Sequence, residues 1–143
     1  MNATTDRDPG VIITNRVHIN RDYDLTDIVS AGAIVSTVGD LARWNSALDA
    51  EQLLTRESKS QMWTLARLND GQPTRYGFGW FIQTLDGHRN FTRNGATSGF
   101  SASAQRFPDD GLNVIVLTNT DEMTAGPLAT KVTALYLDQR KER

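Results

Sequence analysis

The sequence contains no cysteine, which excludes disulfide frameworks and thiolate metal sites. It has two histidines, His18 and His88, far apart and outside any ligand-spaced cluster; we expect both to serve surface or packing roles, and predict no metal or cofactor. No apolar run approaches the roughly 20 residues that span a bilayer, and the N-terminus lacks the apolar segment of a signal peptide. A net charge of −2 gives no field that favours nucleic acid. The chain as written is therefore expected to be soluble, with no nucleic-acid partner and no membrane span.

At 143 residues the chain is long enough for one domain with a real core. Residues 1–30 are rich in Asp, Asn, Arg and Thr and poor in apolar side chains, so they predict an extended or loop-rich arm with room for one short strand. Residues 31–143 carry the periodic patterns. Since a loop of that length is unusual in a compact domain, something on which the arm normally packs is expected to be missing.

Two helices are predicted in the first half of the patterned region. Thr37 and Asp40 form an N-terminal capping pattern for a helix that runs to about Asp49. The spacing of Leu41, Trp44 and Leu48 places these side chains on one face of that helix. Thr55 is predicted to cap a second helix, which residues 69–73 end. Its buried stripe is predicted to contain Met62, Leu65 and Ala66.

The second half alternates with a period of two, which is typical of strands. The predicted strands are Tyr76–Ile82, His88–Arg93, Phe100–Phe107 and Leu112–Thr118, and the short turns between them favour an antiparallel meander. The fourth strand is apolar on both faces and is predicted to be central and buried. A last helix follows, and its predicted stripe toward the sheet is Leu128, Val132, Leu135 and Tyr136. The fold class is α+β.

Catalytic motifs are scarce. None of the three lysines has Ser or Thr three residues before it, and no Gly-x-Ser-x-Gly sequence occurs. Arg93-Asn94-Gly95 ends a predicted strand, where a planar cation suits a carboxylate or phosphate and the glycine lets a ligand approach the backbone. The alternative is a surface arginine beside an ordinary turn. The aromatic residues from Tyr76 to Phe81 can stack on a ligand, although such a strand more often contributes to a core.

The order of several short segments carries a resemblance. These segments are Ala31–Thr37, Asp40–Trp44, Tyr76–Trp80, Arg93–Phe100, Pro108-Asp109 and Val114–Asn119. Their succession resembles the C-terminal part of the β-lactamase-related serine hydrolases, which include class C β-lactamases, penicillin-binding-protein-like D-alanyl-D-alanine peptidases and esterases. The resemblance covers about residues 31–143 and implies an incomplete β-lactamase-like fold.

The resemblance implies roles for one stretch of the chain. In that family a Lys-Thr-Gly or His-x-Gly on a sheet strand faces the nucleophile, and Arg93-Asn94-Gly95 occupies the corresponding position. Arg93 is then expected to face the nucleophile or a substrate carboxylate, together with Thr97 and Ser98 as substrate-binding residues. The backbone N–H of Ala96 is expected to help form the oxyanion hole. Arginine departs from Lys or His and cannot readily shuttle protons, so binding is its expected role.

The family's Ser-x-x-Lys and Tyr-x-Asn motifs are absent, and the resemblance implies that they lie upstream. The resulting prediction is the C-terminal segment of an acyl-transferring hydrolase of esters, amides or β-lactams that is silent alone. Its partners would be a small acyl substrate and the missing N-terminal segment or a second copy. The alternative is a noncatalytic binding or self-association module. The compartment stays open between periplasm and cytoplasm, because an export signal would precede this segment.

Overall fold

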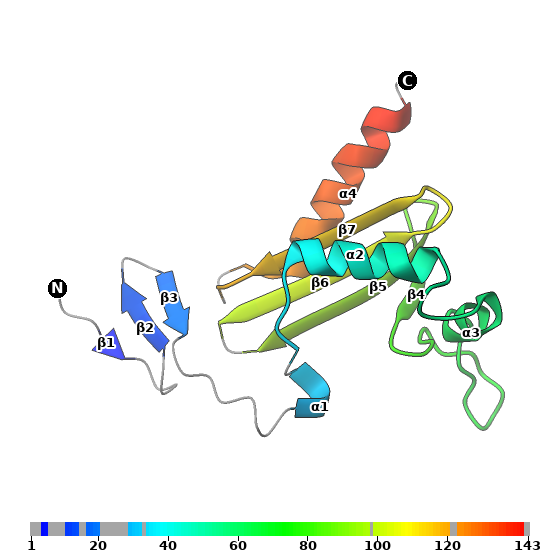
Figure 1. Ribbon diagram of the computed structural model, residues 1–143, viewed down its shortest axis with the longest axis horizontal. Coiled ribbons are helices and arrows are strands. Elements are labelled where there is room, and N and C mark those ends of the chain that lie inside the picture. The colour runs from blue at the N-terminus through cyan, green and yellow to red at the C-terminus, as the bar shows by residue number, and fades with distance from the viewer. Residues whose placement is uncertain are drawn as a thin grey trace.

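A computed structural model of the chain describes residues 4–5, 11–14, 17–20, 29–32, 34–97, 99–120 and 123–141. The helices are α1 (Val29–Gly32), α2 (Val38–Asp49), α3 (Arg56–Met62) and α4 (Ala125–Lys141). The strands are β1 (Thr4–Thr5), β2 (Val11–Thr14), β3 (Val17–Asn20), β4 (Phe81–Leu85), β5 (His88–Thr97), β6 (Phe100–Phe107) and β7 (Leu112–Thr118). They form a three-stranded sheet, β1-β2-β3, and a separate four-stranded sheet, β4-β5-β6-β7 (Figure 1).

The four-stranded sheet is an antiparallel meander, as predicted. β6 and β7 have the predicted bounds, and β5 begins at the predicted His88 but continues to Thr97. Asp86 and Gly87 both have positive φ, 50° and 88°, which matches the right-handed twist of the strands that they join. With helices before the sheet and α4 after it, this arrangement confirms the α+β class and is consistent with a partial β-lactamase-like fold.

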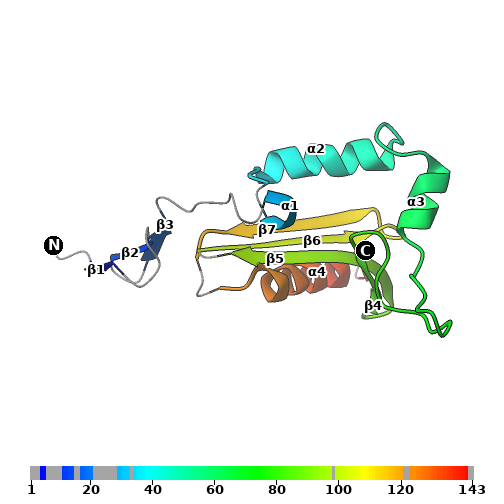
Figure 2. The same cartoon turned by 90° about the horizontal axis from the view of Figure 1, so that it is seen from below.

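Helices cover both faces of the sheet (Figure 2). On the face of α2, the buried guanidinium of Arg106 in β6 donates hydrogen bonds to Asn45 Oδ1 and Asp49 Oδ1. On the face of α4, the neighbouring Gln105 accepts a hydrogen bond from Thr133 Oγ1 at 3.3 Å. Adjacent residues of β6 therefore bond to helices on opposite faces of the sheet, because side chains alternate between the two faces.

The predicted helix caps are confirmed. Thr37 Oγ1 accepts from the Asp40 backbone N–H at 3.1 Å, and Thr55 Oγ1 accepts from the Ser58 N–H at 3.2 Å. Each hydroxyl satisfies an N–H group that has no partner within the helix. On α2, Leu48 is buried and Trp44 stacks on Trp80 with ring centroids 6.3 Å apart.

The prediction for the second helix is wrong in length and in its buried residues. α3 ends at Met62, and Leu65 and Ala66 lie in an exposed irregular segment. The Ala66 N–H donates to Tyr76 O and its carbonyl accepts from Thr74 N–H, both at 2.8 Å, so this backbone pairs across a loop and cannot continue the helix. The buried residue of α3 is Lys59, whose Nζ donates to Leu48 O at 3.0 Å.

The first predicted strand is also misplaced. β4 begins at Phe81, whereas residues 76–80 form a tight turn in which the Gly77 N–H donates to Trp80 O at 2.9 Å. Gly79 has a φ of +77°, a backbone conformation that interrupts a strand and favours glycine. The aromatic pattern predicted an extended segment because the spacing of aromatic residues carries no information about this turn of the backbone.

β7 was predicted to be central, but it is an edge strand of the described sheet. Its apolar character on both faces has another cause, since it contacts α2 on one side and α4 on the other. The prediction for α4 was wrong as well. The residues that α4 buries are Ala125, Ala129, Thr133 and Leu137, whereas Val132, Leu135 and Tyr136 of the predicted stripe are exposed.

Within residues 1–30, β1, β2 and β3 form an antiparallel sheet where the sequence predicted one short strand at most. The rest of the predicted arm, apart from Val29 and Ser30 in α1, lies outside the described residues, and so does the His18 side chain. The division of the chain at residues 30 and 31 stays a prediction. None of the described helices is long and apolar enough to cross a membrane.

Candidate functional site

The C-terminal half of β5 has a strand on one side only. β4 pairs with β5 from His88 to Thr92 and then stops, because Phe81 is its first residue. β6 pairs with β5 from Phe91 to Thr97. Among the described strands nothing covers the other side of residues 93–97, so this part of β5 presents an open edge. Unpaired strand edges are sites at which an extended ligand can add hydrogen bonds.

The direction of the backbone groups on this edge follows from the register. The Ile82 N–H donates to Arg75 O at 2.9 Å and therefore points away from β5. Since N–H and C=O groups alternate along a strand, Phe81 points toward β5 and its partner Thr92 points toward β4. The same alternation directs the N–H and C=O groups of Asn94 and Ala96 into the open edge. The amide predicted from the resemblance to form an oxyanion hole is therefore available for a ligand.

Arg93 is the cation at this edge. Its side chain is exposed, its Nη1 donates a hydrogen bond to Tyr76 Oη, and its guanidinium lies 5.8 Å from the Tyr76 ring centroid. No carboxylate of the described residues lies within ion-pair distance of Arg93. Within the part of the chain that the structure describes, most N–H donors of this guanidinium have no partner and its charge is not neutralised.

The structure does not bring all predicted site residues together. The Asn94 side chain points to the opposite face, where its amide lies 3.2 Å from the position that a Cβ on Gly126 of α4 would occupy. Gly95 has open space around it, with no atom within 4 Å of an added Cβ. Thr97 has a buried Oγ1 that finds no hydrogen-bond partner among the described residues, and Ser98 lies outside them. Arg93, the Ala96 amide and the space at Gly95 thus remain as the candidate site.

Tyr76 is the residue whose role the sequence did not predict. It was noted only as one of several aromatic residues, and 17 residues separate it from Arg93. Arg93 itself was a candidate, but nothing in the sequence links it to one tyrosine among three. The contact forms because the turn after residue 76 brings Tyr76 beside Phe81, where β4 starts.

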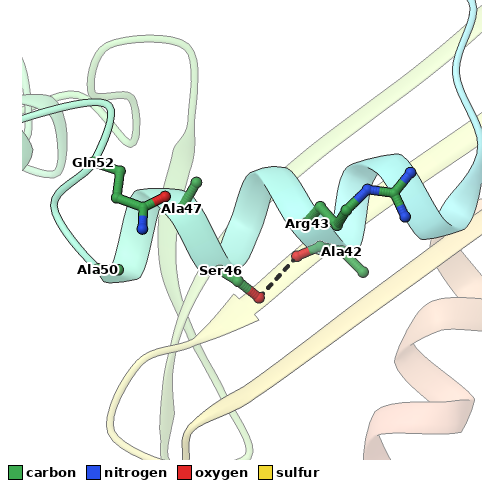
Figure 3. A pocket seen from close by; sticks show the side chains of 6 residues that line it. All are labelled: Ala42, Arg43, Ser46, Ala47, Ala50 and Gln52. Atoms are coloured by element: carbon green, nitrogen blue, oxygen red, sulfur yellow. Dashed lines mark hydrogen bonds between the residues drawn. The ribbon is translucent and has the colours of Figure 1, made fainter.

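Two hollows of the described surface lie away from Arg93. One, about 600 Å³, runs along the outer side of α2 and is lined by Ala42, Arg43, Ser46, Ala47, Ala50 and Gln52 (Figure 3). Two of its polar side chains are engaged, since Ser46 Oγ donates to Ala42 O at 3.0 Å and Arg43 pairs with Asp40. A second hollow lies beside His88, whose Nδ1 is 2.9 Å from both carboxylate oxygens of Asp110. Neither contains an activated nucleophile.

Comparisons with known proteins agree with the geometry. The family model described as Beta-lactamase matches residues 2–138. A protein of Bacillus subtilis (strain 168), Penicillin-binding protein 4*, is 32% identical over 101 residues, which are 70% of this chain and 22% of that protein. The chain thus spans only about a fifth of the length of this curated relative. No solved structure matches the chain.

Proposed function

The chain belongs to the β-lactamase family, and from this premise we propose that it is the C-terminal part of a serine hydrolase that acts on esters, amides or β-lactams. Within that enzyme it supplies the site strand, β5, and one wall of the active site. Residues 31–143 form this contribution. The nucleophile lies on a segment outside these 143 residues, because the chain contains no Ser-x-x-Lys. The chain alone is then catalytically silent.

The observation that carries the proposal is the open edge of β5. The Ala96 N–H points out of the sheet at a position where no described strand pairs with it, and Arg93 stands at the start of the same edge. A backbone amide aimed at a developing oxyanion stabilises it without reorganisation, which is a large term in acyl transfer. The empty space at Gly95 leaves room for the acyl group between these two features.

The reaction that fits this edge is acyl transfer in two steps. A serine oxygen from the absent segment bonds to the acyl carbon, while the N–H groups of Ala96 and of the nucleophile itself stabilise the oxyanion. A base on the absent segment takes the serine hydroxyl proton and passes it to the leaving group as the bond between that group and the acyl carbon breaks. Water then adds to the acyl carbon, and the serine oxygen leaves with one of the water protons. Arg93 stays charged throughout, so its proposed role is to bind a substrate carboxylate.

A complementation assay tests this function. The chain is incubated with a chromogenic β-lactam and with a short-chain nitrophenyl ester, each with and without the upstream segment of its gene. Hydrolysis is expected only in the mixture, and Ser→Ala in the Ser-x-x-Lys of the added segment should abolish it. Hydrolysis by the isolated chain would overturn the claim that its nucleophile lies elsewhere. No hydrolysis in any mixture would favour the second candidate below.

Two exposed features of the described fold support the proposal that a further segment packs on it. The first is the outer edge of β7, which no described strand pairs. The second is an apolar stripe on α4, formed by Val132, Leu135 and Tyr136. A stripe of this kind on a helix normally packs against another element. We propose that the upstream segment covers both features in the complete protein, and that a second copy covers them when that segment is absent.

The second candidate function is a noncatalytic binding or self-association module. The observation that favours it is the same unpaired β7 edge, since a strand edge recruits extended segments through main-chain hydrogen bonds alone. The two candidates differ in their dependence on the β5 edge. An Ala96→Pro substitution removes the outward N–H, so it should abolish restored hydrolysis and leave self-association through β7 intact.

A further inference from the structure

The contact between Tyr76 and Arg93 points to a role for Tyr76 that the proposed function does not include. We propose that Tyr76 is a positioning residue that holds the Arg93 guanidinium and, with its own hydroxyl hydrogen, completes a two-residue clamp for a ligand carboxylate. This inference rests on the proposed function only for the identity of the ligand as a substrate. The clamp itself is a property of the described residues.

The Tyr76 backbone is fixed independently of Arg93. Its carbonyl accepts from the Ala66 N–H at 2.8 Å and from Thr74 Oγ1 at 3.0 Å, and its N–H donates to Thr74 Oγ1 at 3.1 Å. Its ring packs edge-on against Phe81 with centroids 4.6 Å apart. A long arginine side chain is mobile unless it is held. Tyr76 is rigid on these contacts and can therefore hold Arg93 at the edge of β5.

Arg93 and Tyr76 both have hydrogen-bond donors that the described residues do not use. Arg93 Nη1 uses one N–H on Tyr76 Oη, and the described residues leave the other four of the roughly five guanidinium donors to a ligand. Tyr76 Oη acts as the acceptor in this contact, so its own hydrogen stays available to donate. The described residues offer that hydrogen no acceptor within hydrogen-bond distance. Two neighbouring groups thus have donors to spare, and the local charge is positive.

An anion with two planar oxygens fits this arrangement best. A carboxylate can accept from the guanidinium with one oxygen and from the tyrosine hydroxyl with the other, in the plane that Arg93 sets. The clamp lies beside Phe81, the first residue of β4, where the open edge of β5 begins at Arg93. A ligand lying along that edge would place its carboxylate on Arg93 and Tyr76, and its carbonyl near the Ala96 N–H two to three residues farther on.

The test measures carboxylate binding and needs no turnover. The chain labelled with ¹⁵N and ¹³C is titrated with N-acetylglycine and with its methyl ester, and resonances of the Arg93 Nε–H and the Tyr76 ring are followed. We expect the acid to shift both and the ester to shift neither. Tyr76→Phe should weaken binding by about 10- to 100-fold, the usual cost of losing one hydrogen bond to a charged group. Arg93→Gln should abolish it, alone or combined with Tyr76→Phe.

Tyr136→Phe is the matched control. Tyr136 on α4 has Arg140 at 5.8 Å from its ring centroid, the same distance as in the Tyr76 pair, but it lies far along the chain from the β5 edge. This variant should bind the acid as the unaltered chain does. Unchanged Ala66 and Thr74 amide resonances in Tyr76→Phe will show that its fold is intact.

Three results would overturn the clamp: equal affinity of Tyr76→Phe and the unaltered chain, equal response to acid and ester, or no Tyr76 ring shift on binding. Failure of the proposed function is a separate result. If the complementation assay restores no hydrolysis but the acid binds through Tyr76, the clamp stands and the acyl chemistry does not. If hydrolysis is restored and Tyr76→Phe binds the acid as the unaltered chain does, the acyl chemistry stands and the clamp does not.

Discussion

Glycines at two positions illustrate how single residues shape the candidate site. Gly77 is enclosed: an added Cβ would collide with the Met62 carbonyl oxygen and lie 2.9 Å from Ile82 Cδ1. Gly95 is open, with nothing within 4 Å. Both look alike in the sequence, as glycines in an aromatic or polar strand pattern. The first is required by packing, whereas the second leaves space beside an outward-pointing amide, which is what a ligand site needs.

This contrast gives a prediction for the two glycines. Gly77→Ala should lower the free energy of unfolding by about 2 kcal/mol or more, because a methyl group pressed against backbone cannot be accommodated by a rotamer change. Gly95→Ala should change the free energy of unfolding by less than about 0.5 kcal/mol, but this substitution should reduce any restored hydrolysis. Urea denaturation of both variants checks the pair. A Gly77→Ala chain as stable as the parent would contradict the packing argument.

At the scale of elements, buried polar side chains as well as apolar ones hold the helices against the sheet. Arg106 is 2% exposed and joins β6 to α2 through Asn45 and Asp49, and its guanidinium lies 5.5 Å from the Trp63 ring centroid. Such a group stabilises the docking of α2 only while its partners are in place, since a buried charge without them is costly.

Arg106→Ala should therefore destabilise the protein by about 3 kcal/mol, the loss expected for a buried, multiply bonded arginine. The matched control is Arg89→Ala. Arg89 pairs with Asp109 at 2.6 Å, but both side chains are more than half exposed, so its loss should cost under about 1 kcal/mol. Thermal unfolding of both variants measures the difference. Equal losses would mean that α2 is held mainly by apolar packing.

The elements also show what sequence reasoning can and cannot predict. The helix caps and the short connections of the meander were predicted well, because Thr37, Thr55 and turn residues such as those at Asp86-Gly87 act through contacts within a few residues. The buried stripe of α4 was not, because hydrophobic periodicity alone places bulky apolar side chains on the buried face. Here Ala125 and Ala129 pack on the sheet, and Leu135 faces outward. The Arg93 position was found through the resemblance, whereas its contact with Tyr76 depends on a turn that periodicity does not register.

At the scale of the whole molecule, the outward stripe of α4 and the unpaired β7 edge have the same implication. The described fold leaves large apolar side chains and main-chain groups on the surface of one helix and one strand. Isolated exposed apolar residues are ordinary, but three on one face of a helix beside a free strand edge indicate a contact surface. We expect the chain without its upstream segment to satisfy this surface by self-association.

Leu135→Lys tests that expectation. Leu135 is 67% exposed, so the substitution should not disturb the described packing, yet a charge in the centre of the stripe should disfavour any partner there. Light scattering at rising concentration should show the parent as an oligomer. The variant should need about a tenfold higher concentration to associate, equivalent to about 1.4 kcal/mol.

Leu68→Lys is the control, since Leu68 is 57% exposed in a loop distant in sequence from the stripe, and this variant should behave as the parent does. A parent chain that stays monomeric at high concentration would contradict self-association. An oligomer unaffected by Leu135→Lys would assign the contact to the β7 edge alone.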